Sequence, residues 1–190
     1  MRFVFDIRKA VAATGFLCEL NRGSIDTLKI VKMLYLADRT ALLEWHRPIT
    51  GDTFWSLGHG PIVGRIYDLI RGKIMGPERE IWGKIFKPVI EQEDKLSLRE
   101  TVKPNIKPLS RREMAALEKA YKTIMPLSSE ALSDLVHKLP EWTNPGEASL
   151  LIDPKTIFFC EKYSEEDIKS IEQELDMAQA AKLDLQSFIE

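Results

Sequence analysis

Residues 25–46 constrain the fold more than any other segment, because their apolar side chains recur with helical spacing around most of a helix circumference. One face, at spacings of three and four, consists of Val31, Leu34, Tyr35, Ala41, Leu42 and Trp45. The apolar residues beside that face are Ile30, Met33, Leu36, Ala37 and Leu43. A helix that is apolar on most sides belongs inside a globular protein. We therefore expect residues 25–46 to form a central helix.

Asp38 lies on the apolar face of this helix. An ionised carboxylate without a partner is costly in a protein core, so a donor must meet it. The expected partners are Arg47, Arg65, His59 and His137. We favour a buried network that fixes the packing of the first three helices, and a catalytic role for Asp38 is the alternative.

Shorter elements precede and follow the central helix. A helix over residues 5–20 comes first, and Ser24 or Asp26 is expected to cap the central helix. The segment "TGDTFWSL" has the composition of a short strand. Pro61 then stands where a third helix could begin, because proline is favoured at the first helical position.

The second half of the chain is predicted to return to helices after a small hairpin. The segments "IWGKIFKPVI" and "KLSLRE", joined by the charged turn "EQED", read as a loose hairpin with Pro88 on an edge strand. Ser110 and Glu113 form a capping box before another helix, and Ser128 or Ser129 begins the next. Ser164 begins a long acidic helix with an apolar stripe of Ile168, Ile171, Leu175 and Ala178.

This order of elements predicts an α+β fold, namely a mostly α-helical single domain with a small antiparallel β-sheet. A chain of 190 residues can bury roughly 70% of its unfolded surface without disulfides or metals. Cys18 and Cys160 belong to no Cys-x-x-Cys pair, so both are expected to be small buried hydrophobes.

Charge and hydropathy exclude several classes of protein. Lys29, Lys32 and Asp38 interrupt the most apolar stretch, so no segment reaches the roughly 18 apolar residues of a membrane span. The first ten residues lack the pattern of a signal peptide, and we expect a cytoplasmic protein. No clustered basic face is visible, so direct nucleic-acid binding is not expected. Residues 164–190 hold eight acids and two bases, a net charge of −6.

The stretch "RPITGDTFWSLGHGPI" concentrates unusual residues between positions 47 and 62. His59 lies between Gly58 and Gly60, where exposed amides near a helix start could hold an anion. The stretch lacks the length and the lysine of a phosphate-binding loop, so a tight turn with a packed imidazole is the favoured interpretation.

Catalytic chemistry has little support in the sequence. The three histidines, His46, His59 and His137, form no metal-binding pattern, and no Gly-x-Ser-x-Gly elbow is present. We therefore expect no enzyme, no metal and no cofactor. The tryptophans at positions 55, 82 and 142 are more suggestive, because tryptophan contributes strongly to protein interfaces.

A specific series of motifs then runs from residue 29 to residue 63. Its members are Lys32, Leu34, Tyr35, Ala37 and Asp38, then Pro48 to Gly51, Phe54, Trp55, and His59 to Pro61. This series resembles the opening motif of the SocA-like Panacea antitoxin domain family. The segment after residue 109 is similar to the second block of that family, with Leu132, Leu135, His137 and Trp142 in matching positions. Together the resemblances cover roughly residues 5–150.

The resemblance implies a mostly helical antitoxin that binds and neutralises a toxin protein encoded nearby, without enzymatic activity. Residues 1–150 would be the Panacea-like domain. Members of the family can carry helix-turn-helix modules, and too few residues precede the first motif here to hold one. Residues 151–190 would be a C-terminal extension whose acidic helix packs on the same domain or covers part of a basic toxin.

Candidate residues follow from this interpretation. The expected structural network consists of Tyr35, Asp38, His59, His137 and Trp142, with Asp38 and His59 fixing the strand and turn onto the central helix. The candidates for contact with the toxin are Arg47, Asp52 and Trp55. Two alternatives stay open: an adaptor that delivers the toxin to a protease, and a small hydrolase or nucleotide-binding enzyme built from Asp38, His59 and His137. The sequence names neither the toxin nor the oligomeric state.

Overall fold

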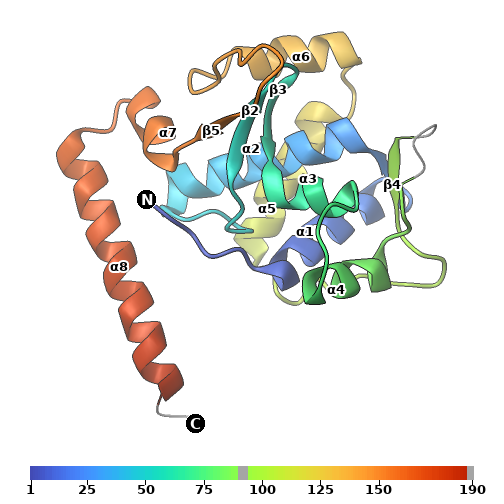
Figure 1. Ribbon diagram of the computed structural model, residues 1–190, viewed down its shortest axis with the longest axis horizontal. Coiled ribbons are helices and arrows are strands. Elements are labelled where there is room, and N and C mark those ends of the chain that lie inside the picture. The colour runs from blue at the N-terminus through green and yellow to red at the C-terminus, as the bar shows by residue number, and fades with distance from the viewer. Residues whose placement is uncertain (90–93, 188–190) are drawn as a thin grey trace.

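Helix α2 (Thr27–Trp45) runs through the centre of the protein, whose computed structural model describes residues 1–89 and 94–187 (Figure 1). The elements packed against it are α1 (Ile7–Leu20), α3 (Gly64–Ile70), α5 (Arg111–Ile124), α7 (Pro154–Cys160), β1 (Ser24–Asp26) and β3 (Gly60–Val63). The other elements are β2 (Phe54–Leu57), α4 (Pro77–Ile85), β4 (Lys95–Ser97), α6 (Ser129–His137), β5 (Leu150–Ile152) and α8 (Glu165–Ser187). The predicted central helix and the mostly helical α+β fold are confirmed.

The helix starts that the sequence marks most clearly are also confirmed. Asp26 caps α2, since its carboxylate accepts from the Lys29 amide at 3.1 Å. Ser110 and Glu113 form the expected capping box at α5. The Ser128 hydroxyl accepts from the Ala131 amide at 3.2 Å and caps α6. Each of these capping signals involves residues within one turn of the helix, so it does not depend on contacts with distant parts of the chain.

Two small antiparallel sheets accompany the helices. One has the order β3-β2-β5, and the other pairs β1 with β4. In the first sheet Trp55 of β2 lies opposite Ile62 of β3 and Leu151 of β5. Residues opposite one another share a face, so these three side chains lie on the same side of the sheet.

The predicted helix start at Pro61 is wrong. Residues 60–63 form strand β3, which makes a hairpin with β2, and α3 begins only at Gly64. Gly60 has φ +96°, which lets the chain turn back at the start of the strand. β3 is an edge strand, so the backbone amide that Pro61 lacks is not needed to pair with a further strand.

The hairpin predicted for residues 81–100 is wrong in its first arm. Residues 77–85 form helix α4, which buries Trp82, and β4 pairs with β1. Among the residues that the structure describes, an isolated β-bridge between Phe86 and Leu98 connects the two predicted arms. Most of the "EQED" turn lies outside the described residues, since it covers positions 91–94.

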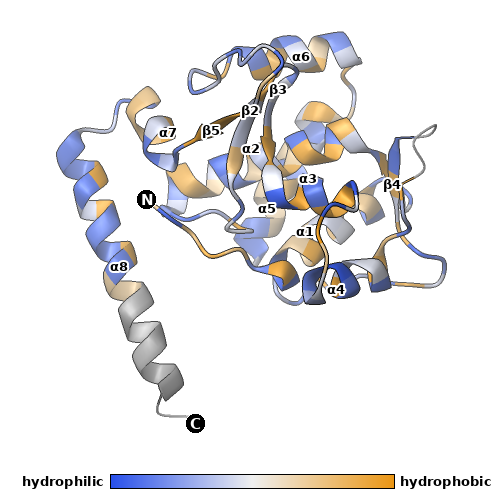
Figure 2. Cartoon of the chain, in the orientation of Figure 1, coloured by the Kyte–Doolittle hydropathy of each residue, from blue (hydrophilic) through white to orange (hydrophobic). Residues whose placement is uncertain are grey.

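The C-terminal part contains β5 and α7, which the sequence did not indicate, and the expected long helix α8. Ser164 and Asp167 cap α8 reciprocally, with the Asp167 carboxylate accepting from the Ser164 amide at 3.0 Å. Ile168 and Ile171 are buried, whereas Ala178 further along the predicted stripe is exposed. In Figure 2 most of the first turns of α8 are coloured as hydrophilic residues. The helix is therefore anchored at its beginning.

Candidate functional site

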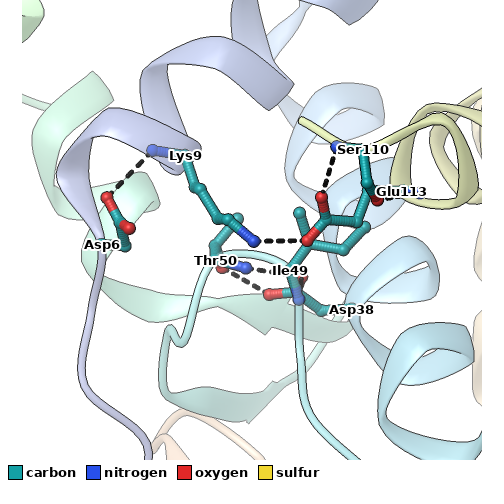
Figure 3. Close-up of polar contacts among 7 residues, drawn as sticks. All are labelled: Asp6, Lys9, Asp38, Ile49, Thr50, Ser110 and Glu113. Atoms are coloured by element: carbon teal, nitrogen blue, oxygen red, sulfur yellow. Dashed lines mark hydrogen bonds and ion pairs between the residues drawn. The ribbon is translucent and has the colours of Figure 1, made fainter. Parts of the chain in front are cut away.

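The loop between α2 and β2 is fixed by the buried carboxylate of Asp38. One carboxylate oxygen accepts from the amides of Ile49 at 2.8 Å and Thr50 at 3.1 Å, and the other accepts from the Thr50 hydroxyl (Figure 3). The Thr50 carbonyl in turn accepts from the Asp6 amide at 2.9 Å, which connects the loop to the start of α1. Asp38 thus positions the loop, as the expected structural role requires.

The expected cationic partners of Asp38 are not its partners. Its hydrogen bonds come from Ile49 and Thr50, while Arg65 forms a bidentate pair with Glu78, with both distances at 2.9 Å. His59 is exposed in the β2–β3 turn. The predictions that His59 fixes Asp38 and that its imidazole packs inside a tight turn are therefore both wrong. Burial raises the pKa of Asp38 to about 7, against the opposing effect of its hydrogen bonds.

Asp52 has a second structural role in the same loop. Its carboxylate accepts from the amides of Arg65 at 2.8 Å and Ile66 at 2.9 Å, which lie in the first turn of α3. The residue is 4% exposed, and burial raises its pKa to about 6. Asp52 is therefore occupied in capping a helix and is not available as a surface contact, which corrects the sequence-based candidate.

His137 and Trp142 hold the tip of the β2–β3 hairpin. Their rings stack with centroids 4.0 Å apart and an angle of 11° between the planes. The Trp142 indole donates to the Leu57 carbonyl at 3.0 Å, and His137 Nε2 lies 3.1 Å from the Gly58 carbonyl oxygen. These two members of the expected network do act together, on the hairpin rather than on Asp38.

A further buried network went unrecognised in the sequence. The Glu141 carboxylate accepts from the Tyr35 hydroxyl at 2.6 Å and from Arg39 Nε at 2.7 Å. Arg39 also reaches Glu161 at 2.5 Å, just beyond the end of α7. Tyr35 was expected in a network, but Glu141 lies in an irregular loop where no periodic pattern reveals burial. The residue closest to Glu141 that the sequence marks as part of a network is Trp142.

The outward face of the β3-β2-β5 sheet is the most conspicuous apolar surface near this loop. Trp55 is half-buried, and its indole N–H donates to the Thr53 hydroxyl at 3.1 Å. The ring lies so close to Gly64 that a Cβ atom there would come within 2.4 Å of it. Leu151, on the same face, is 60% exposed. Hollows of about 320 and 460 Å³ flank Trp55 on two sides.

Arg47, the remaining contact candidate, is exposed just after α2. It follows His46, which ends that helix in the left-handed conformation with φ 59°. No hydrogen bond or ion pair ties Arg47 to another residue in the part of the chain that the structure describes. Arg47 and Trp55 are thus both accessible, whereas Asp52 is not.

The residues of the hypothetical enzyme site do not form one constellation. Asp38 is bound to its own loop, whereas His137 is stacked at the hairpin tip beside the exposed turn that holds His59. Cys18 is fully buried, which raises its pKa to about 12, and Cys160 is partly exposed. Among the described residues, no group of three or more His, Cys, Asp or Glu is placed to hold a metal ion.

None of the described helices is both long and apolar enough to cross a membrane.

Comparison with known proteins gave one match. The family model described as "Antitoxin SocA-like, Panacea domain" matches residues 30–143, which is more than half of the chain. No curated protein and no solved structure matched the chain. The matched range contains α2 from Ile30 onward, the Asp38 loop, the hairpin and both rings that hold its tip.

Proposed function

Because the chain belongs to the family of SocA-like antitoxins with a Panacea domain, we propose that it neutralises a cognate toxin by binding that protein directly. The family match is the observation that carries the proposal. It supports an antitoxin role, and the loop and hairpin inside the matched range are held in place by hydrogen bonds of Asp38, Asp52 and Trp142. A rigid, preorganised surface loses little conformational entropy on binding, which favours affinity.

The outward face of the β3-β2-β5 sheet is the surface that we assign to the toxin. Trp55 lies at its centre, between Ile62 and the largely exposed Leu151. Tryptophan in a recessed, well-supported position is typical of the residues that dominate binding energy. The hollows beside Trp55 would accept side chains of the partner. Arg47 is a second proposed contact.

The first experiment is coexpression of this chain with the small protein encoded beside it. Growth rescue together with co-purification of a stable complex would support neutralisation by binding. Rescue accompanied by disappearance of the toxin, and restored toxin levels when cellular proteases are inactivated, would support the adaptor alternative instead. Rescue with neither a complex nor toxin loss would contradict both and reopen the enzyme hypothesis.

The proposed surface is tested by substitution in that complex. We expect Trp55→Ala to weaken toxin binding by about 2 kcal/mol or more, roughly 30-fold, because a central aromatic anchor is lost. Leu151→Ala is expected to cost less, and Leu20→Ala, which shortens an exposed apolar side chain at the end of α1, serves as the matched control. Calorimetric titration with folded variants is the measurement.

Binding that stays within about 1 kcal/mol of the unsubstituted protein for both Trp55→Ala and Leu151→Ala would exclude this face as the interface. Arg47→Ala is measured in the same series. Its exposed guanidinium should affect the association rate and its salt dependence more than the final affinity.

A further inference from the structure

The two edges of the β3-β2-β5 sheet differ in how well they are covered. β3 forms one edge and β5 the other (Figure 1). Every residue of β3 is buried, whereas Leu150 and Leu151 of β5 are 46% and 60% exposed. An exposed sheet edge presents unpaired backbone groups to other chains, so proteins usually protect such edges. β5 is therefore the edge of this sheet that another chain can reach.

The register of the hairpin shows which way the backbone groups of β2 point. The Gly64 amide donates to the Thr53 carbonyl at 2.8 Å, and these two residues continue the β2–β3 ladder by one position. In an antiparallel ladder, pairs that exchange hydrogen bonds alternate with pairs that do not. Two positions further on, Trp55 and Ile62 are therefore a hydrogen-bonded pair. The amide and carbonyl of Trp55 point toward β3.

The same alternation turns the backbone of Leu151 away from the sheet. Because Trp55 bonds to β3, the residues before and after it bond to β5, opposite Ile152 and Leu150. Leu151 lies between these two pairs and opposite Trp55, so its amide and carbonyl point to the free side of β5. Neither group has a hydrogen-bond partner among the residues that the structure describes.

The outer side of β3 agrees with this alternation and shows how the other edge is protected. Pro61 is at a position that does not bond to β2, and its carbonyl points away from β2 and accepts from Lys32 Nζ at 3.4 Å. Proline has no amide hydrogen to offer on that side. Residues 150–152, by contrast, include neither a proline nor a charged residue, the side chains that commonly protect an edge. β5 lacks the protection that β3 has.

We propose that an extended segment of the toxin pairs with the free edge of β5 and adds one strand to the sheet. This inference rests on the antitoxin function proposed above, and it adds the mode of binding. The Leu151 amide and carbonyl form hydrogen bonds with the backbone of that segment. Alternate side chains of the segment lie on the face that holds Leu151 and Trp55, so those side chains are expected to be apolar.

A toxin segment fits this edge better than a second copy of the chain. Two copies paired about Leu151 would share one reciprocal pair of hydrogen bonds along a strand of three residues, roughly 10 Å long. A stable interface usually buries about 1,200 Å² or more, which so short a contact does not supply. A toxin segment can continue from β5 onto the Trp55 face, because the hollow of about 320 Å³ is lined by both Trp55 and Ser149, the residue before β5.

Amide hydrogen exchange tests the inference in the free chain and in the complex with the small protein encoded beside it. In the free chain the Leu151 amide should exchange much faster than the amides of Leu150 and Ile152, which bond to β2. With free toxin at about 100 times its Kd, exchange at Leu151 should slow by roughly 100-fold. Lys103, exposed in the loop between β4 and α5, is the control amide, and its rate should stay the same.

A proline substitution separates the backbone contact from the side-chain contact. Leu151→Pro removes the outward amide hydrogen, and an edge strand tolerates proline where the amide faces away from its neighbour. It should weaken toxin binding by about tenfold more than Leu151→Ala, which shortens the side chain but keeps the amide. Continued protection of the Leu150 and Ile152 amides shows that β5 still pairs with β2 in the variant.

Several results would overturn the inference. A complex in which the Leu151 amide exchanges as fast as in the free chain would exclude strand pairing and leave the antitoxin function standing. Equal binding by folded Leu151→Pro and Leu151→Ala would have the same meaning. Protection of Leu151 in the free chain would show that the edge is not open, or, if the protection increases with chain concentration, that a second copy occupies it. Absence of any complex would remove the proposed function and this inference together.

Discussion

Two buried carboxylates, Asp38 and Asp52, hold the same short loop through its backbone amides and those of the helix that follows. Thr50 connects them, since its hydroxyl donates to Asp38 and accepts from the Asp52 amide at 3.2 Å. Burial raises the pKa of Asp38 to about 7 and that of Asp52 to about 6, from an ordinary value of 3.8. Both groups therefore bind protons in the folded protein at pH values where the unfolded chain has released them.

This difference gives stability a defined pH dependence. Between about pH 4 and pH 7 the folded state holds more protons than the unfolded state, so the free energy of unfolding decreases as the pH rises through that window. Asp38→Asn should flatten the dependence, because an amide oxygen can still accept from Ile49 and Thr50 without titrating. Urea unfolding at pH 5 and pH 8 measures the effect.

Asp134→Asn, a change at an exposed position of α6, is the control for the loss of a carboxylate as such. It should leave the difference between pH 5 and pH 8 as it is in the unsubstituted protein. An unaltered pH dependence in Asp38→Asn would show that another group is responsible.

The partner of Asp38 illustrates what sequence can predict about a single residue. Its place on an apolar helix face indicates burial, and burial requires donors, so both were predictable. The identity of the donors was not, because backbone amides belong to every residue and carry no sequence signal. The same reason explains Asp52, whose role depends on amides thirteen and fourteen positions away.

At the scale of helices and strands, the β2–β3 hairpin is held by α6 and by the loop that follows α6. Trp142→Phe would keep the stack on His137 but remove the hydrogen bond to the Leu57 carbonyl. We expect a loss of about 1 kcal/mol in the free energy of unfolding, and about 3 kcal/mol for Trp142→Ala, which also removes the ring. Chemical denaturation of the two variants side by side measures the difference. Equal losses would show that the hydrogen bond, not the stack, holds the hairpin.

Helix α8 offers a test at the same scale, because its beginning is anchored and its later turns are exposed up to residue 178. Ile168 and Ile171 are buried, Glu172 pairs with Lys155 at 2.9 Å, and Met177 is 72% exposed. Ending the chain after residue 163 should therefore lower the thermal midpoint by several degrees, through the loss of about 3 kcal/mol of apolar burial. A chain that ends after residue 178 keeps Ile168 and Ile171, and its midpoint measures what the residues beyond 178 add.

The pair of truncations also separates two roles of α8. If the chain ending at residue 178 is stable but loses toxin binding, the last turns cover part of the partner. If it keeps full binding, the helix serves the domain itself. A chain ending at residue 163 that is as stable as the full one would contradict the anchoring by Ile168 and Ile171.

For the molecule as a whole, the helices were predictable and the strands were much less so. A helix of about four or five turns carries its own periodicity and caps, as α2 and α5 do. The strands contain three or four residues each, and they are specified by partners far away in the chain. Strand β1, for example, pairs with β4 about seventy positions later, and nothing in its three residues indicates that.

The contact between Trp55 and Gly64 has a consequence for sequence evolution as well as for folding. A Cβ atom at position 64 would lie 2.4 Å from the indole, so a larger residue there requires a smaller one at position 55. The two positions should therefore change together among homologous sequences, with tryptophan at the first accompanied by glycine at the second. Lineages that had lost the indole would be free to place alanine or serine at the second position.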